Sequence, residues 1–351
     1  MSTHKSMKIP ETQVAFGFRR GEKNIVRYDK WPVTRPKDGE VLVEVKAAGL
    51  CQSDVHIVHG QPGYIPDELV MGHEIAGQIV EVGGQSVPDD YQVGERVAIA
   101  IASFCGICDN CRSGFDNNCL RSVEAYGLTL DGGFQQFLLI KNLRGLIPIP
   151  DQVTYEQAAI ASDAVLTPFH AINKARQDLV PTAHVLVMGM GGLGLNALQI
   201  LRNYGCTIVA VDIKPEAKKL AKEYGATEFF SDISESDYSR QSFDVCFDFC
   251  GFQETFDVCQ EYVKARGRID TVGLGRSKLF VRNFELARKE VKINFNFGGT
   301  SQEQVECMKW VAQGRIKPLS TAVPFNLLPD YLNKLAQGKV NGRVVFHPSK
   351  L

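Results

Sequence analysis

The chain contains 351 residues, enough for about two domains that each bury a core. Hydrophobic residues make up 44% of it, as in an ordinary globular protein, and 39 basic residues against 40 acidic ones leave a net charge of −1. It has no long basic run and no apolar N-terminal segment, so we expect no nucleic-acid partner, no membrane association, no secretory signal and a cytoplasmic location.

The first 150 residues are typical of a small antiparallel β-barrel. Short segments that alternate apolar and polar residues are separated by glycines and prolines. The segment 41–45 alternates most clearly, and it leads into a polar run that begins at Cys51. We expect strands at residues 14–18, 24–28, 41–45, 78–82, 96–101 and 134–140.

After Pro150 the pattern changes to alternating strands and helices, which predicts a doubly wound parallel sheet. Two helices are expected first, at 155–161 and 166–176. The expected strands are 185–188, 208–211, 245–249, 268–272 and 291–297, and the expected helices between them are 193–204, 216–224 and 255–263. Helices at 304–312 and 328–336 and a closing strand at 343–346 complete the chain.

A glycine-rich turn joins the apolar run 185–188 to the helical segment that follows. In a G-x-G-x-x-G turn the first glycine permits the tight turn, the second lets a pyrophosphate approach, and the third lets the helix pack against the strand. Asp212, 18 residues after the last glycine, would bind a ribose 2′-hydroxyl and repel a 2′-phosphate, so we expect NAD(H). The predicted cofactor contacts here are Gly189, Gly191, Gly192, Leu193, Gly194 and Asp212.

Two other interpretations of this stretch are weaker. It could be a glycine-rich turn of some other α/β protein, or a membrane span, because residues 185–201 are almost continuously apolar. The glycines, together with Asn196 and Gln199, favour a strand, a turn and a helix over a span.

Four of the ten cysteines lie within fifteen residues, in a lobe at about 104–120. Four thiolates complete a tetrahedral zinc shell and leave no open position, so they predict a structural zinc rather than a set of unrelated thiols. The cluster consists of Cys105, Cys108, Cys111 and Cys119. The other cysteines after it are expected to be small buried side chains.

A second metal site is suggested by Cys51 and His73. A catalytic zinc needs three protein ligands and one open position. Cys51 follows the alternating strand and precedes Asp54, a carboxylate of the kind that orients a ligating imidazole. His73 lies between Gly72 and Glu74.

In order along the chain, these motifs resemble the zinc-dependent medium-chain alcohol dehydrogenases, most closely the yeast-type alcohol dehydrogenases and carbonyl reductases. The resemblance covers nearly the whole chain. It implies a GroES-like β-barrel catalytic domain at 1–163, a Rossmann NAD-binding domain at 164–300, and a return to the catalytic domain at 301–351. The motifs are the run from Gly49 to His56, Gly72-His73-Glu74, the four-cysteine lobe and the glycine turn.

The resemblance also implies the catalytic zinc ligands, and with them two zinc ions per chain. Cys51 and His73 match the first two ligands, and Asp163 stands where the family usually has a cysteine. Aspartate is a legitimate zinc ligand that donates less charge than sulfur. Because some ketone reductases share this variant, we expect secondary alcohols and ketones as substrates. Glu74 matches a residue that can approach the metal.

Further roles follow from the same resemblance. Ser53 and His56 match the proton relay, and Thr167 matches a residue near the nicotinamide. Arg343 matches a pyrophosphate-binding arginine, with a solvated surface arginine as the alternative. Gln52 replaces a basic residue that usually touches the pyrophosphate, which predicts weaker cofactor binding.

Two rival functions stay open: a zinc-independent quinone or enoyl reductase on the same scaffold, and a non-catalytic NAD(H)-binding protein. The resemblance suggests a homodimer or homotetramer, with residues 291–297 as a candidate edge strand between subunits. The final tripeptide Ser349-Lys350-Leu351 matches a peroxisomal address, which would apply in a eukaryotic cell.

Overall fold

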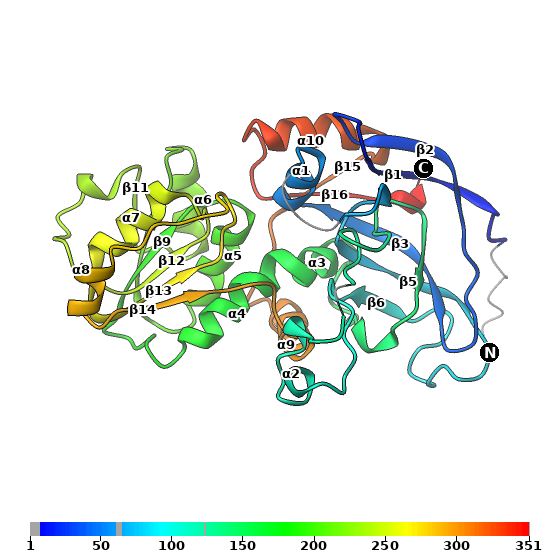
Figure 1. Cartoon of the computed structure of the whole chain (residues 1–351), viewed down its shortest axis with the longest axis horizontal. Helices are drawn as coiled ribbons and strands as arrows, with labels where there is room; N and C mark the ends of the chain where they lie inside the picture. The colour runs from blue at the N-terminus through cyan, green and yellow to red at the C-terminus, as the bar shows by residue number, and fades with distance from the viewer. Residues whose placement is uncertain (1–7, 61–64, 123, 351) are drawn as a thin grey trace. The chain divides into compact units, whose positions relative to one another are not determined.

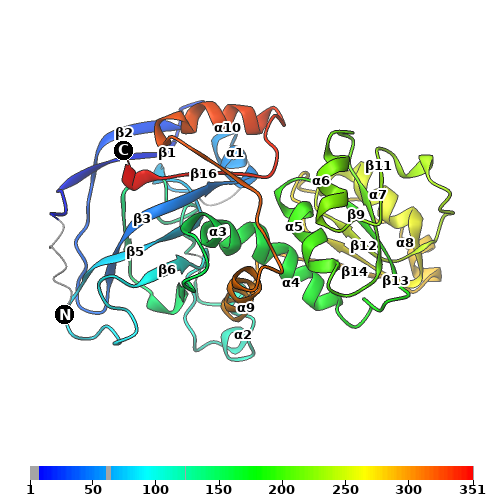
Figure 2. The same ribbon diagram turned by 180° about the vertical axis from the view of Figure 1, so that it is seen from behind.

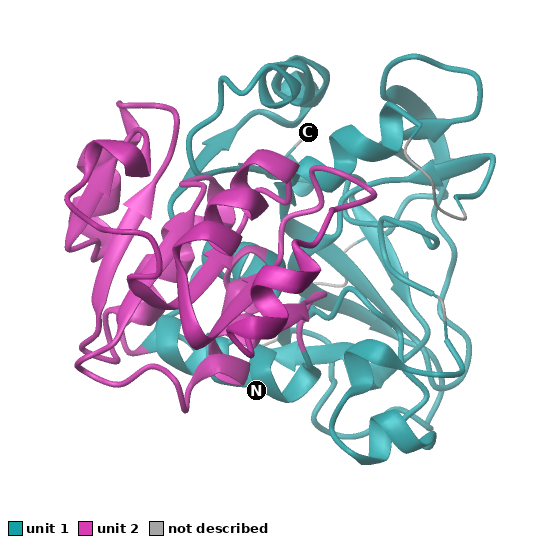
Figure 3. Ribbon diagram, turned by 60° about the vertical axis from the view of Figure 1, so that its left-hand side comes forward, with its two compact units in different colours: residues 1–163, 300–312, 319–351 teal, residues 164–299, 313–318 magenta. Residues whose placement is uncertain are grey.

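The computed structural model describes residues 8–60, 65–122 and 124–350 (Figure 1). The chain divides into two compact units (Figure 3). The first unit comprises residues 1–163, 300–312 and 319–351, and the second comprises residues 164–299 and 313–318. Most of the N-terminal segment in which a secretory signal would lie, and Leu351 of the C-terminal tripeptide, lie outside the described residues. Within the described ranges, no helix is both long and apolar enough to cross a membrane.

The first unit is built on two β-sheets. Its strands are β1 (Thr12–Arg19), β2 (Val26–Pro32), β3 (Val41–Leu50), β4 (Glu68–Val70), β5 (Glu74–Val82), β6 (Arg96–Ile99), β7 (Phe137–Ile140), β8 (Leu146–Pro148), β15 (Ser320–Val323) and β16 (Arg343–Phe346). The larger sheet has the order β15-β16-β3-β5-β6-β8, with β7 also pairing with β3, and the smaller sheet has the order β2-β1-β4. All pairs except β15–β16 are antiparallel.

Strand β3 is the centre of this unit. It pairs with β5 along most of its length, with β7 at residues 41–44 and with β16 at residues 48–50. Nine of its ten residues are buried, so both of its faces are covered. The adjoining core contains Phe16, Phe134 and Phe346, and the rings of the last two meet edge to face with centroids 6.0 Å apart. The C-terminal end of β3, where Cys51 follows, is therefore firmly held.

The helices of the first unit are α1 (Gln52–Val58), α2 (Asp109–Arg112), α3 (Tyr155–Ile160), α9 (Ser301–Ala312) and α10 (Leu328–Ala336). The sequence pattern does not predict α1, which is only two turns long. Helix α9 begins three residues before the expected position 304, because Thr300 and Glu303 cap each other's backbone N–H groups.

The second unit is a doubly wound parallel sheet. Its strands are β9 (His184–Met188), β10 (Thr207–Val211), β11 (Glu228–Phe230), β12 (Phe243–Asp248), β13 (Val263–Thr271) and β14 (Lys292–Phe295). Every pair is parallel in the order β11-β10-β9-β12-β13-β14, so the order reverses between β9 and β12. A ligand of such a sheet binds at the carboxyl ends of the strands where the order reverses.

Helices cover both faces of this sheet. They are α4 (Leu166–Ala175), α5 (Gly192–Leu201), α6 (Ala217–Tyr224), α7 (Gln253–Tyr262) and α8 (Asn283–Arg288). Helices α7 and α8 lie in front of the sheet in Figure 1, and α5 and α6 lie in front of it in Figure 2. With the barrel-like sheets of the first unit, this arrangement confirms the predicted fold class.

Candidate metal and cofactor sites

Two neighbouring segments of the larger sheet bring Cys51 and His73 together. Cys51 is the N-cap of α1, directly after β3, and its backbone N–H donates to the Asp54 carboxylate over 2.9 Å. His73 immediately precedes β5, which pairs with β3. The second oxygen of Asp54 lies 3.7 Å from Nδ1 of His73, and Asp54 is fully buried. Asp54 therefore orients both residues, and it turns Nε2 of His73 toward the candidate ligands.

Asp163 reaches this place from a helix of irregular geometry. Residues 161–165 form a single π-helical turn between α3 and α4. Such turns insert an extra residue into a helix and recur at functional sites. The turn brings Oδ2 of Asp163 to 3.5 Å from Sγ of Cys51 and 3.7 Å from Nε2 of His73.

These separations fit a metal shell. Zinc–sulfur and zinc–oxygen bonds of about 2.3 and 2.0 Å at tetrahedral angles would separate the two ligand atoms by about 3.5 Å. The ligand atoms of Cys51, His73, Glu74 and Asp163 all lie within 4.8 Å of one another, and all four residues are buried. The arrangement can therefore hold one zinc ion.

Glu74 is engaged by another group. The Nε of Arg343 lies 3.0 Å from its carboxylate, and both side chains are almost completely buried. Cys51, His73 and Asp163 then remain as three protein ligands, which is the number that leaves a catalytic zinc one open position.

The guanidinium of Arg343 also contacts the ligand atoms directly. Its Nη2 is 3.4 Å from both Sγ of Cys51 and Oδ2 of Asp163. Since only 5% of Arg343 is exposed, the alternative of a solvated surface arginine is wrong. Its expected contact with a pyrophosphate stays a prediction.

Charge balance gives a second test of the metal site. Among the described residues of this cluster, Cys51, Asp54, Glu74 and Asp163 can each carry a negative charge, whereas Arg343 alone is permanently positive. Burial raises the pKa of Glu74 well above its ordinary value. Burial also opposes ionisation of Asp163, but the hydrogen bond and charge of His73 and the charge of Arg343 outweigh it and lower the pKa of that carboxyl. Burial opposes protonation of His73, but the charge of Asp54 and the hydrogen bond with Asp163 outweigh it and raise the pKa of the imidazole well above its ordinary value. Protons on His73 and Glu74 therefore balance the buried acidic groups here, and a bound divalent cation would take the place of such protons.

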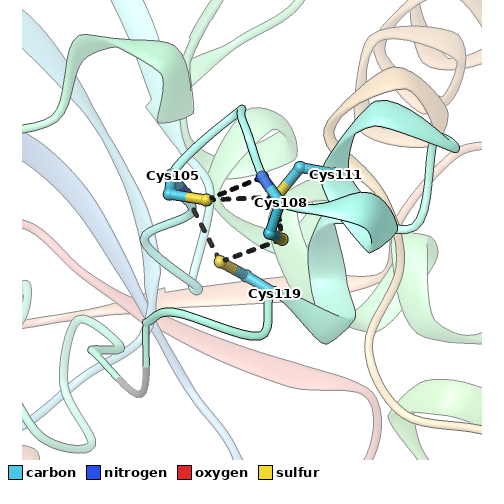
Figure 4. A group of neighbouring side chains, drawn as sticks. All are labelled: Cys105, Cys108, Cys111 and Cys119. Carbon is cyan, nitrogen blue, oxygen red and sulfur yellow. Dashed lines mark hydrogen bonds between the residues drawn. The ribbon is translucent and has the colours of Figure 1, made fainter.

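The four cysteines of the lobe converge in the same way (Figure 4). Sγ of Cys108 lies 3.4 Å from that of Cys111 and 4.0 Å from that of Cys119, and Sγ atoms of Cys105 and Cys111 are 3.9 Å apart. Four zinc–sulfur bonds of about 2.3 Å would place the sulfurs about 3.8 Å apart. The lobe therefore fits a structural zinc with no open position.

Backbone N–H groups prepare these thiols for a metal. The N–H groups of Cys105 and Cys108 point at the sulfurs of Cys119 and Cys105, at 3.4 and 3.3 Å. Backbone donors of Cys111 and Leu120 lower the pKa of Cys108 to about 6. Burial and the hydrogen bond with Cys108 raise the pKa of Cys111 to about 12. A thiolate is thus already favoured within the cluster, as zinc binding requires.

The glycine turn after β9 has the shape that a dinucleotide requires. Gly189 has φ +90°, which favours glycine, and a methyl group on Gly194 would lie 1.8 Å from the Gly189 carbonyl oxygen. A methyl group on Gly191 would meet nothing within 4 Å, so the backbone is open on that side. Gly192 and Leu193 begin α5, whose N-terminus favours a phosphate.

Asp212 follows β10 and already touches this turn. Its Oδ2 accepts a hydrogen bond from Met190 N–H over 2.6 Å, and its Oδ1 accepts one from Lys214 N–H over 2.9 Å. The carboxylate is only partly buried, so it lies at the edge of the turn where a ribose could compete for it.

The expected proton relay lies on α1. Ser53 Oγ is 3.8 Å from Cys51 Sγ, and His56 lies one turn further along the helix. Burial, followed by the charge of the neighbouring His59, lowers the pKa of His56, so its neutral form is favoured. Thr167 is buried in α4, which belongs to the second unit.

Two residues near these sites were not recognised from the sequence. Gly49 pairs with Glu74 across β3 and β5, and a methyl group on Gly49 would lie 2.1 Å from Oε2 of Glu74. Cys250, expected to be buried, is half-buried, and its Sγ would be 2.4 Å from a methyl group on Gly189. Only the strand register and the loop after β12 reveal these contacts, so no sequence signal would have found them.

Comparison with known proteins agrees with this geometry. Residues 37–151 match the model of the alcohol dehydrogenase GroES-like domain, and residues 192–313 match that of zinc-binding dehydrogenases. The chain is 30% identical to an alcohol dehydrogenase of Geobacillus stearothermophilus over 89% of this chain and 93% of that protein. It is 28% identical to an alcohol dehydrogenase of Schizosaccharomyces pombe over 98% and 100% of the two chains.

Among solved structures, it is similar to acetophenone reductase from Geotrichum candidum in complex with NAD. The TM-score is 0.91 at 36% identity, and the alignment covers 98% of this chain and 99% of the other.

Proposed function

The chain belongs to the zinc-dependent medium-chain alcohol dehydrogenase family, and on this premise we propose that it transfers a hydride between NAD(H) and a secondary alcohol or ketone. It is an NAD-dependent zinc alcohol dehydrogenase or carbonyl reductase, and its cofactors are zinc and NAD(H). The observation that carries the proposal is the convergence of Cys51, His73 and Asp163 in a buried place with Glu74 held by Arg343. Neither a zinc-independent reductase nor a binding protein would need that arrangement.

Ketones and secondary alcohols are the preferred substrates for two reasons. Asp163 supplies oxygen where the family usually supplies sulfur, which would leave a bound zinc more electron-poor. The similar protein from Geotrichum candidum is named for a ketone, acetophenone.

When bound, zinc would polarise the substrate oxygen and the nicotinamide would exchange the hydride. The chain's own residues handle the proton. We assign Ser53 to exchange it with the substrate oxygen, because its hydroxyl lies beside Cys51. We assign His56 to pass it toward solvent, because its ring is half-buried on the same helix and its neutral form can accept a proton.

The remaining assignments concern the cofactor and Glu74. We propose that the glycine turn and Asp212 bind the pyrophosphate and ribose, and that Thr167 borders the nicotinamide. Arg343 would bind the pyrophosphate when the dinucleotide is present and contact the Glu74 carboxyl group when it is absent; the separation of 3.0 Å between them supports the second role. Glu74 would then be free to approach the metal while Arg343 is engaged elsewhere.

We also propose that two copies of the chain pair through β14. This strand is at the edge of the parallel sheet, so its outer N–H and C=O groups can accept another strand. Phe295 and Phe297 are more than half exposed, and Phe284 on the preceding helix is 75% exposed. Exposed aromatic residues beside a free edge are typical of an interface between subunits.

The metal content tests the proposed function directly. Purified protein should carry two zinc ions per chain, and Cys51→Ala should carry one, whereas the control Cys206→Ala, a buried cysteine of the second unit, should keep two. With NADH, the intact enzyme should reduce acetophenone more efficiently than hexanal, measured as kcat/KM.

One zinc per chain that persists in Cys51→Ala, together with turnover of a quinone, would replace the proposal by the zinc-independent reductase. NADH binding without turnover of any of these substrates would indicate the binding protein.

A further inference from the structure

We propose that the four-cysteine lobe has a second role: through Asp116 it fixes the point at which the chain returns from the second unit to the first. Asp116 is therefore a positioning residue that couples zinc in the lobe to the start of α9. The contacts that do this all lie within the first unit.

Asp116 is unlike its neighbours in the lobe. Between Cys111 and Cys119 it is the one buried residue, in a short 3-10 turn formed by Asp116–Asn118. A carboxylate is rarely buried without a partner. Both of its oxygens are used by one residue 185 positions later: Oδ1 accepts the Ser301 backbone N–H over 3.0 Å, and Oδ2 accepts the Ser301 hydroxyl.

Ser301 lies at the crossover of the chain. The long segment 164–299 of the second unit ends at Gly299, and the first unit resumes at Thr300, before residues 313–318 return briefly to the second unit. Gly298 has φ +56° and is followed by Gly299, so two residues without side chains directly precede the crossover. Gly299 packs closely against Leu166, and a glycine pair by itself restricts the backbone little, so contacts made just after the pair help to set the direction of the chain.

Helix α9 begins at this crossover with two separate caps. Thr300 and Glu303 satisfy each other's backbone N–H groups within the helix. The N–H of Ser301 is one of the first four donors of a helix and has no partner inside it. Asp116 supplies that partner from the lobe, and its negative charge suits a helix N-terminus.

The lobe itself depends on its metal. Ile107, Phe115 and Leu120 are each about half exposed or more, so the lobe packs few apolar side chains of its own. Metal-binding free energy then becomes the folding free energy of the loop that carries Asp116. Loss of the zinc would release Asp116 and loosen the start of α9, and by linkage the loss of Asp116 would weaken zinc binding in the lobe.

Hydrogen exchange of the Ser301 amide tests the contact, because this amide has its partner in Asp116. Asp116→Ala in the intact, zinc-loaded enzyme should speed exchange at residues 300–303 by about tenfold or more, since the lost hydrogen bond has a charged acceptor. Asp109→Ala is the matched control, because it removes an exposed carboxylate from α2 of the same lobe. Asp116→Asn, which keeps a carbonyl acceptor, should have an intermediate effect and guards against a folding failure.

Zinc release gives a second readout. Measured in the Cys51→Ala background, where the lobe zinc is the one expected to remain, the zinc of Asp116→Ala should pass to a chromogenic chelator faster than that of Asp109→Ala. Ser301→Ala should add little to Asp116→Ala, because the hydrogen bond that it removes is already lost there. Cys111→Ser, which empties the lobe, should speed exchange at residues 300–303 as Asp116→Ala does.

Equal exchange at residues 300–303 in Asp116→Ala and Asp109→Ala would overturn the inference. The inference would also be overturned if Cys111→Ser sped hydrogen exchange within the lobe but left exchange at residues 300–303 unchanged. Neither outcome depends on which substrate the enzyme reduces, so the proposed function would stand or fall separately.

Discussion

The two groups of candidate metal ligands are built in opposite ways. The four-cysteine lobe takes all its ligands from fifteen consecutive residues, lies partly at the surface, and orients its sulfurs with local backbone N–H groups. The other group takes Cys51, His73 and Asp163 from three distant segments and buries them with Glu74 and Arg343. A closed, local shell can do no more than hold structure, whereas an open shell assembled at long range can also accept a substrate.

The largest effect should come from removing one candidate ligand from each group in separate variants. Asp163→Ala should lower turnover by about a thousandfold or more, because a site with two ligands no longer holds a zinc that polarises the substrate. It should retain the lobe zinc and a nearly unchanged Tm. Cys111→Ser should show the reverse pattern, with one zinc left, a lower Tm and easier proteolysis near residues 105–120.

Zinc content, Tm and kcat measured on both variants check this contrast. If Asp163→Ala kept two zinc ions and full turnover, Asp163 would not be a ligand, and the difference between the two groups would disappear.

A smaller effect concerns proton transfer, which only the open site needs. Because the pKa of His56 is lowered from its ordinary value of about 6.5, the ring stays neutral to a lower pH than a free imidazole would. As the pH falls through that lowered pKa, the ring becomes protonated and can no longer accept a proton, so alcohol oxidation should decline. His56→Gln should reduce kcat for oxidation by about tenfold and remove this acidic decline.

A pH profile of kcat for both proteins decides the point, with His59→Gln as the exposed neighbouring control. In the control, the decline in kcat should persist but occur at a slightly higher pH, because the charge of His59 contributes to the lowered pKa of His56. An unchanged decline in His56→Gln would assign it to another group.

The smallest effect should come from Gln52, which is exposed beside Cys51 at the start of α1. The neutral amide gives no ionic contact with a pyrophosphate. Gln52→Arg should therefore tighten NADH binding by about fivefold, in the range of a partly screened ion pair. Gln52→Met is the neutral control of similar size, and titration of NADH fluorescence gives both Kd values. Equal affinities would remove Gln52 as the cause of weak cofactor binding.

The sequence by itself determined the features whose residues are close neighbours in the chain. The cysteine spacing predicted a tetrahedral lobe, and the run from β9 through the glycine turn to Asp212 predicted a nucleotide-binding strand, turn and helix. The alternation of strands and helices after Pro150 predicted the parallel sheet, which the structure confirms. Local motifs are visible in this way because backbone geometry and metal coordination act over a few residues.

Only the tertiary structure decided how distant segments meet. It placed Asp163 in a π-helical turn, put Arg343 beside the candidate metal ligands, and set Gly49 opposite Glu74 through the register of β3 and β5. It also joined Asp116 to Ser301 across 185 residues. These contacts depend on sheet register, helix irregularity and chain return, and each arises from packing between segments that carry no mark of one another in the sequence.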